Sequence, residues 1–88
     1  PQEFELSQNY PNPFNPATKI RYTLPEAGNV KLVVYNLLGE QVEELVNEFK
    51  EAGVHTINFN AENLNSGVYI YKIELNGFTD AKKMQLVK

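Results

Sequence analysis

The sequence predicts an all-β domain, a sandwich or barrel of short antiparallel strands. Turn-forming residues recur at short and fairly even intervals, as expected of several short strands in succession: Pro25 to Gly28, Gly39, Gly53, Asn65 to Gly67 and Asn76-Gly77. Between these turns, apolar and polar residues alternate with the period of two that is typical of half-buried strands. The proline-rich segment from Asn9 to Pro16 cannot be helical, because each proline fixes φ and lacks a backbone donor.

Length and composition indicate one folded domain. The chain has 88 residues, of which 42% are hydrophobic, and it contains five Tyr and five Phe. A chain of this size buries roughly 60–65% of its unfolded surface, which is enough for one small core. The net charge is −3, the charges are interspersed, and Arg21 is the only arginine. This pattern argues against binding to nucleic acid.

Several kinds of site are excluded by composition. The chain has no cysteine, so disulfides, thiol catalysis and zinc–thiolate sites are ruled out. No apolar run approaches the roughly 20 residues of a membrane-spanning helix, and no signal peptide is recognisable. Because the chain begins at Pro1, we expect it to be part of a longer protein with any export signal upstream.

The first element is a stiff, extended segment, here called the collar (residues 1–17). Each residue that precedes a proline is pushed toward extended geometry. We expect the collar to pin Tyr10 and Phe14 onto the core and to set the angle between an upstream domain and a sandwich formed by residues 18–88. The collar residues that define it are Tyr10, Pro11, Pro13, Phe14 and Pro16.

Five strands follow from alternation. They are expected at Lys19 to Leu24, Val30 to Val34, Val54 to Asn60, Tyr69 to Leu75 and Phe78 to Val87. Asn76-Gly77 predicts a type I′ hairpin turn between the last two, since both residues tolerate positive φ. The large side chains expected to be mostly buried are Ile20, Tyr22, Leu32, Val34, Ile57, Phe59, Tyr71 and Ile73.

The segment Gln41 to Ala52 is ambiguous. Its apolar residues stand at helical spacing, i, i+3, i+4 and i+7: Val42, Leu45, Val46 and Phe49. The segment is also rich in glutamate, and Gly53 could end a helix. Local evidence therefore leaves helix and strand about equally open.

The sequence argues against an enzyme, a metal site and a cofactor. His55 is the only histidine, and a lone histidine on a strand is usually structural or solvent-facing. Asp80 is the only aspartate and has no neighbouring ligands for calcium. Glu43-Glu44 has the character of a solvated charge pair, and Ser66 lacks the flanking glycines of a nucleophile elbow.

The tyrosines leave two interpretations open. Tyr22, Tyr69 and Tyr71 share strand faces with apolar residues, which favours core packing with hydroxyls reaching the rim. The alternative is a sugar-stacking platform of a carbohydrate-binding module, but the absence of tryptophan weakens it.

Five blocks of residues follow one another over nearly the whole chain: Asn9 to Ile20 with Tyr22 and Leu24-Pro25, Val34 to Gly39, Ala52 to His55, Leu64 to Lys72, and Lys83 to Lys88. In this order they resemble the type A C-terminal sorting domains of the type IX (Por) secretion system. No single block is specific, but five in order are. Phe59 is one departure, since the family often has Trp there, and a packing role would survive that change.

The resemblance implies an immunoglobulin-like antiparallel β-sandwich of about seven strands, related to domains of flagellar hook-capping proteins. It favours a strand with a bulge over a helix for Gln41 to Phe49. It also implies a non-catalytic signal that directs an upstream passenger across the outer membrane, so that the protein is secreted or reaches the cell surface. The implied partners are that passenger, translocon components and a sortase-like peptidase that often removes the domain; a monomer is expected.

The resemblance locates recognition by the translocon at two segments. One is the turn before a strand and the other is the last strand, and the residues named for this role are Gly67, Val68, Tyr69, Lys83, Val87 and Lys88. Two other functions stay open: a carbohydrate-binding or adhesive module of a secreted enzyme, and a structural spacer or assembly module. An exposed row of Tyr rings would favour the former, and a large self-complementary apolar patch or an open strand edge the latter.

Overall fold

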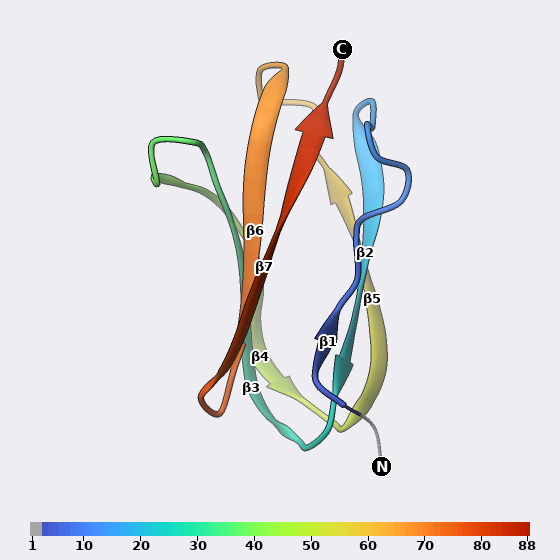
Figure 1. Ribbon diagram of the computed structural model, residues 1–88, viewed down its shortest axis with the longest axis vertical. Coiled ribbons are helices and arrows are strands. Elements are labelled where there is room, and N and C mark those ends of the chain that lie inside the picture. Colours follow the sequence, from blue (N-terminus) through green and yellow to red (C-terminus); the bar gives the residue numbers. More distant parts are fainter. Residues whose placement is uncertain (1–2) are drawn as a thin grey trace.

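The computed structural model describes residues 3–88 as seven β-strands (Figure 1). The strands are β1 (Glu5–Leu6), β2 (Ala17–Leu24), β3 (Gly28–Tyr35), β4 (Gln41–Lys50), β5 (Gly53–Asn60), β6 (Gly67–Leu75) and β7 (Phe78–Leu86). The all-β prediction is therefore confirmed. Over this described range there is no helix of the length and apolarity needed to cross a membrane.

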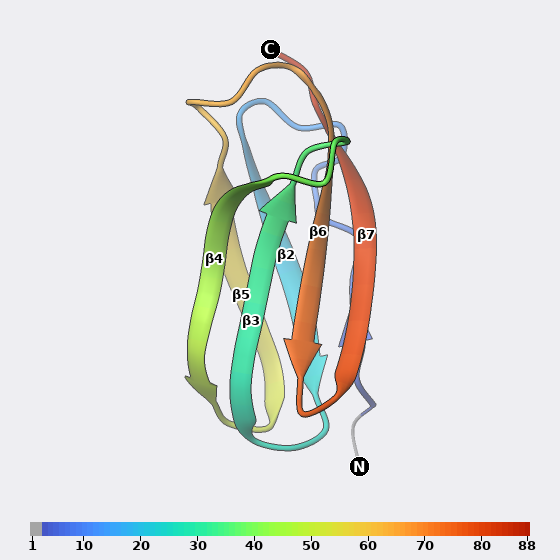
Figure 2. The same cartoon turned by 90° about the vertical axis from the view of Figure 1, so that its left-hand side faces the viewer.

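The strands form two antiparallel sheets that pack face to face. One has the order β1-β2-β5 and the other β4-β3-β6-β7. Figure 1 shows the two layers edge-on, and Figure 2 shows the larger sheet face-on with the smaller sheet behind it. The chain crosses between the sheets after β2, β4 and β5, as in an immunoglobulin-like sandwich, with the fourth strand on the sheet of the third. The domain is elongated, measuring 38 × 23 × 17 Å.

The core lies between the inner faces of the two sheets. Of the eight large side chains predicted to be buried, seven are at most 2% exposed. The prediction is wrong for Ile57, which is only half-buried. Ile57 lies on β5, an edge strand that has no neighbour on its far side, so its side chain borders a cleft.

The ambiguous segment forms strand β4, so the helical alternative is wrong. Its pairing with β3 shifts register twice, leaving Leu45 and Val42 as extra residues. A β-bulge inserts one residue and rotates the following side chains to the other face. Leu45 and Val46 can therefore both pack against the core although they are adjacent. Two bulges in a strand thus reproduce the apolar spacing of a helix, and the predicted bulge is confirmed.

The hairpin between β6 and β7 has the predicted turn. Asn76 has φ of 45° and Gly77 has φ of 90°, as type I′ geometry requires. The close packing of Asn76 also explains Gly28, because a Cβ atom there would lie 2.7 Å from the Asn76 side-chain nitrogen.

The collar runs between the two sheets and contacts both. Tyr10 forms an isolated bridge with Lys19 of β2, and Phe14 forms one with Leu86 of β7. Phe14 is buried as predicted, at 1% exposure, but Tyr10 is 81% exposed. The expectation that Tyr10 packs onto the core is therefore wrong. Its backbone is the part that is anchored, and the ring is left on the surface.

Candidate functional site

The two segments expected to carry recognition lie side by side in the structure. The first residues of β6 pair with the last residues of β7: Gly67 with Leu86, Val68 with Gln85, and Tyr69 with Met84. We call this region, Gly67–Tyr69 with Lys83–Lys88, the C-terminal rim. It lies at the end of the sandwich where the chain terminates (Figure 1).

Side chains of the rim divide between surface and core. Lys83, Val87 and Lys88 are exposed, whereas Gly67 and Val68 are half-buried. Because side chains alternate along a strand, Val68 and Lys83 lie on the outer face of the larger sheet, opposite the buried Tyr69 and Met84. The rim therefore offers two apolar side chains, Val68 and Val87, and two ammonium groups, Lys83 and Lys88, at the surface.

Tyr69 packs in the core as expected, but sequence analysis missed the hydrogen bond that its hydroxyl makes. Its side chain is 8% exposed, and its hydroxyl donates a hydrogen bond of 2.7 Å to the carbonyl oxygen of Asn65, four residues upstream. This arrangement is the tyrosine corner of immunoglobulin-like domains, which fixes the loop that enters the strand. A tyrosine placed early in a strand after a polar turn is the signal that could have identified it.

The end of the chain is tethered to the rim. The backbone N–H of Lys88 donates to the Ser66 hydroxyl at 3.0 Å, and its ammonium donates to the Glu62 carbonyl at 2.6 Å. These contacts hold the chain terminus beside the loop that precedes β6.

The collar covers the free backbone edge of the rim. Phe14 N–H donates to the Gln85 carbonyl, and Val87 N–H donates to the Phe14 carbonyl, each at 2.9 Å. Gln85 N–H donates to the Asn12 side chain at 3.0 Å, and the Gln8 side-chain amide donates to the Lys83 carbonyl at 2.6 Å. Since an exposed strand edge invites pairing with other chains, these contacts protect the edge of β7 and leave the side chains of the rim as its accessible groups.

A buried polar network anchors the collar. The Tyr71 hydroxyl donates to the Ser7 carbonyl at 2.7 Å and accepts from Asn9 N–H at 2.8 Å. The Asn9 side-chain amide donates to the Thr18 hydroxyl at 3.1 Å, and Asn9 and Thr18 are both nearly fully buried. Burial raises the pKa of Tyr71 to about 12, although the hydrogen bond from Asn9 opposes this. Sequence analysis missed Asn9 and Thr18, because nothing local shows that they are buried.

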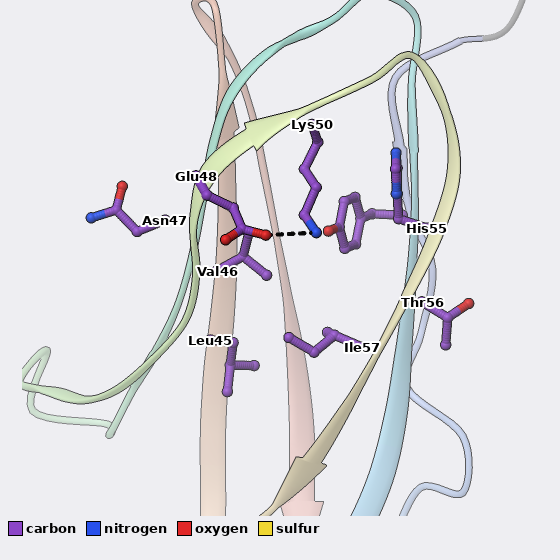
Figure 3. Close-up of a pocket in the computed structure, with 9 residues that line it drawn as sticks. Leu45, Val46, Asn47, Glu48, Lys50, His55, Thr56 and Ile57 are labelled. Carbon is purple, nitrogen blue, oxygen red and sulfur yellow. Dashed lines mark ion pairs between the residues drawn. The ribbon is translucent and has the colours of Figure 1, made fainter.

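A cleft opens on the opposite side, between the edge strands β4 and β5 (Figure 3). Leu45, Val46 and Ile57 line it, and at its mouth the Lys50 ammonium lies 2.8 Å from the Glu48 carboxylate. The hydrogen bond from Lys50 lowers the pKa of Glu48.

His55 also lines this cleft, where its ring stacks on Tyr22 at 5.4 Å between ring centroids. Its Nε2 lies 2.8 Å from the Glu51 carbonyl. Across residues 3–88, no three His, Cys, Asp or Glu side chains are close enough to hold a metal ion.

The tyrosines do not form a sugar platform. Tyr22, Tyr69 and Tyr71 are all buried. The large aromatic side chains exposed among the described residues are Tyr10, Phe49 and Phe78, and these lie on separate elements. An exposed row of coplanar Tyr rings, which would have favoured carbohydrate binding, is therefore lacking in this part of the chain.

Fold and surface together define an immunoglobulin-like module with an exposed, lysine-bearing rim at one end of the sandwich. The chain belongs to the family of secretion system C-terminal sorting domains, whose model matches residues 8–87. It is a sorting signal for type IX secretion, which leads to the cell surface or out of the cell, and the family is in general not catalytic. No curated protein sequence matches this chain.

Proposed function

We propose that this domain is a folded, non-catalytic secretion signal, which the type IX translocon recognises through side chains of the C-terminal rim. The observation that carries the proposal is the pairing of Gly67–Tyr69 with the end of β7, which unites two segments from different parts of the chain in one surface. Val68, Lys83, Val87 and Lys88 are the contact residues, while Gly67 and Tyr69 fix the shape of the loop.

Geometry supports this role for the rim. The described chain enters the sandwich at the end opposite the rim (Figure 1), and the long dimension of the domain is 38 Å. A passenger joined upstream would then sit away from the surface that the translocon reads. The collar (residues 1–17), tied to the sandwich of residues 18–88 by buried hydrogen bonds, would set the angle between them.

The proposed partners are the upstream passenger in the same chain, outer-membrane translocon components, and a sortase-like peptidase that removes the domain. The domain acts as a monomer and needs no cofactor. The carbohydrate-binding and spacer alternatives are not favoured, because the large apolar side chains that are exposed lie scattered over several elements and form neither a ring platform nor one patch.

The test is an export assay with the domain fused to the C-terminus of a periplasmic reporter, in a host that has the type IX translocon. The intact fusion should leave the cell. Deleting Lys83 to Lys88 would be uninformative, because it removes Met84 and Leu86, which are each 1% exposed, and would unfold the domain. Changing Lys83→Ala, Val87→Ser and Lys88→Ala together alters only exposed side chains, and should reduce export while leaving the unfolding midpoint nearly unchanged.

The matched control is Lys31→Ala with Lys72→Ala. Both lysines are exposed on the larger sheet but lie away from the rim. Normal export of this control, with loss in the rim variant, would support the proposal. Full export of a folded rim variant would show that these side chains are not needed for recognition. Retention of the intact fusion, when an established sorting domain exports the same reporter, would refute the export role of this chain.

A further inference from the structure

Tyr10 is held rigidly and yet exposes its ring. Its backbone N–H donates to the Lys19 carbonyl and its carbonyl accepts from Lys19 N–H, both at 3.0 Å. The neighbouring Asn9 is anchored in the buried network. The Tyr10 ring is 81% exposed and so contributes little to the core. The hydrogen-bonded backbone therefore holds this ring in place at the surface.

The surface is hollowed on both sides of this ring. One groove is lined by Tyr10, Pro11, Ala17, Lys19 and Asn58. The other borders Tyr10 and Lys19 and extends to Gln8 and Arg21. Strand alternation places Lys19, Arg21 and their cross-strand partners Asn58 and Thr56 on the outer face of the smaller sheet. We call Tyr10, Lys19, Arg21 and Asn58 the Tyr10 face.

The charge of the Tyr10 face differs from that of the domain. Lys19 and Arg21 are exposed, and neither forms an ion pair within residues 3–88. The chain as a whole carries a net charge of −3. A pair of uncompensated cations on an acidic domain gives this face a preference for an acidic partner.

We propose that the Tyr10 face is a second docking surface for the export machinery, fitted to an acidic protein surface with an apolar pocket for the Tyr10 ring. Tyr and Arg are the residue types enriched among binding hot spots, where a ring fills a pocket and charged groups surround it. The groove beside Pro11 and Ala17 receives an apolar side chain of the partner. This inference rests on the proposed function, but it concerns residues separate from the C-terminal rim.

A protein fits this face better than an acidic polysaccharide. Sugar chains are gripped by successive rings, and the Tyr10 face has one ring, since Tyr22, Tyr69 and Tyr71 are buried. Beside Tyr10, Pro11 and Ala17, this groove is also lined by Lys19 and Asn58, so it combines apolar contacts with polar groups that can bind a carboxylate, as an acidic protein segment requires.

The experiment places a photo-crosslinking amino acid at position 10, in place of Tyr10, in the reporter fusion described above. Irradiated cells should yield an adduct with an envelope protein of the translocon, identified by mass spectrometry, with the crosslinked peptide in an acidic region. Adding Lys19→Glu with Arg21→Glu should reduce the adduct about tenfold, because charge reversal turns attraction into repulsion. The same crosslinker in place of Phe49, an exposed aromatic on β4, is the matched control and should not give this adduct.

Export is measured in parallel for Tyr10→Ala and Phe49→Ala. Tyr10→Ala should slow export about tenfold at an unchanged unfolding midpoint, and Phe49→Ala should export normally. An adduct with polysaccharide, with a second copy of the domain or with nothing, or an adduct insensitive to charge reversal, would overturn the proposal. The crosslink is scored whether or not the reporter leaves the cell. Failure of the intact fusion to be exported would count against the proposed function. Failure of the crosslink would count against the Tyr10 face as a docking surface.

Discussion

The two long sides of the sandwich are closed in different ways. On the side of β7 and β2, the collar fills the gap: Phe14 is buried and paired with β7, and Asn9 is tied to Tyr71. On the side of β4 and β5 the short turn at residues 51–52 joins the sheets at one end, and a cleft remains between the two strands. The same core is thus sealed by packed chain on one side and left open to solvent on the other.

Their strand edges are also protected by different devices. The end of β7 has its edge covered by hydrogen bonds from the collar. Strand β4 has no such cover, but two bulges interrupt it, and it carries Glu43, Glu44 and Glu48. Bulges and charges on an edge discourage pairing with other chains. The comparison indicates that the collar side supports stability, whereas the bulges and charges of the open side discourage pairing with other chains.

The largest expected difference between the sides is in core packing. Phe14→Ala removes a ring that is 1% exposed and lies 6.1 Å from the Phe59 ring, and should lower the free energy of unfolding by about 3–5 kcal/mol. Phe49→Ala on β4 removes a ring that is 58% exposed and should change it by about 0.5 kcal/mol or less. Urea unfolding of both variants measures the two effects. Similar losses in the free energy of unfolding for the two variants would contradict the proposed difference between the collar side and the open side.

The second difference is in the response to alkaline pH. The pKa of Tyr71 is about 12 in the folded state, because burial disfavours the phenolate, against an ordinary value of about 10. Because the pKa is raised in the folded state, its contribution to stability is fully present at pH values below the unfolded-state pKa. That contribution is lost as pH rises from about 10 to 12. The loss should be roughly 2–3 kcal/mol at most.

Comparison with Tyr71→Phe isolates this effect from the titration of the lysines and other tyrosines. The stability advantage of the wild-type protein over this variant should shrink as pH rises from about 9 to 12. An advantage that stays constant over this range would show that the phenol of Tyr71 does not titrate as inferred.

Hydrogen bonding gives a third contrast, measured at neutral pH. Tyr71→Phe leaves the Ser7 carbonyl and Asn9 N–H without their partner and should cost about 1–3 kcal/mol. Tyr22 is equally buried, but its hydroxyl makes no hydrogen bond to another described residue. Tyr22→Phe should therefore be nearly neutral. Thermal unfolding of the two variants compares them, and an equal loss would mean that the network anchoring the collar contributes little.

The smallest expected effect concerns the ion pair at the mouth of the cleft. Lys50 and Glu48 lie at the surface of the open side, where water and salt screen their attraction. Glu48→Gln should leave the unfolding midpoint unchanged at both low and high salt. A clear, salt-dependent decrease would show that this side is held by charge and would sharpen its contrast with the collar side.

Local patterns in the sequence predicted most of the strands. Alternation gave the inward residues of β2, β3 and β6, since side-chain direction in a strand depends only on position along it. The turn at Asn76-Gly77 was predictable for a similar reason, because positive φ is a property of the residues themselves. Composition also predicted no chemistry at His55 and Asp80, and this stays a prediction.

Tertiary structure decided what local patterns cannot encode. The bulges of β4 depend on its pairing with β3, and they gave a strand the apolar spacing of a helix. Tyr10 and Phe14 are similar residues in one motif, yet the chain buries one ring and exposes the other. The collar is fixed by partners that lie 62 residues away at Tyr71 and 73 residues away at Gln85. A backbone group can form a hydrogen bond with any partner that folding brings within reach. The choice of partner is therefore a property of the whole fold, whereas the direction of a side chain in a strand depends on its position along the strand.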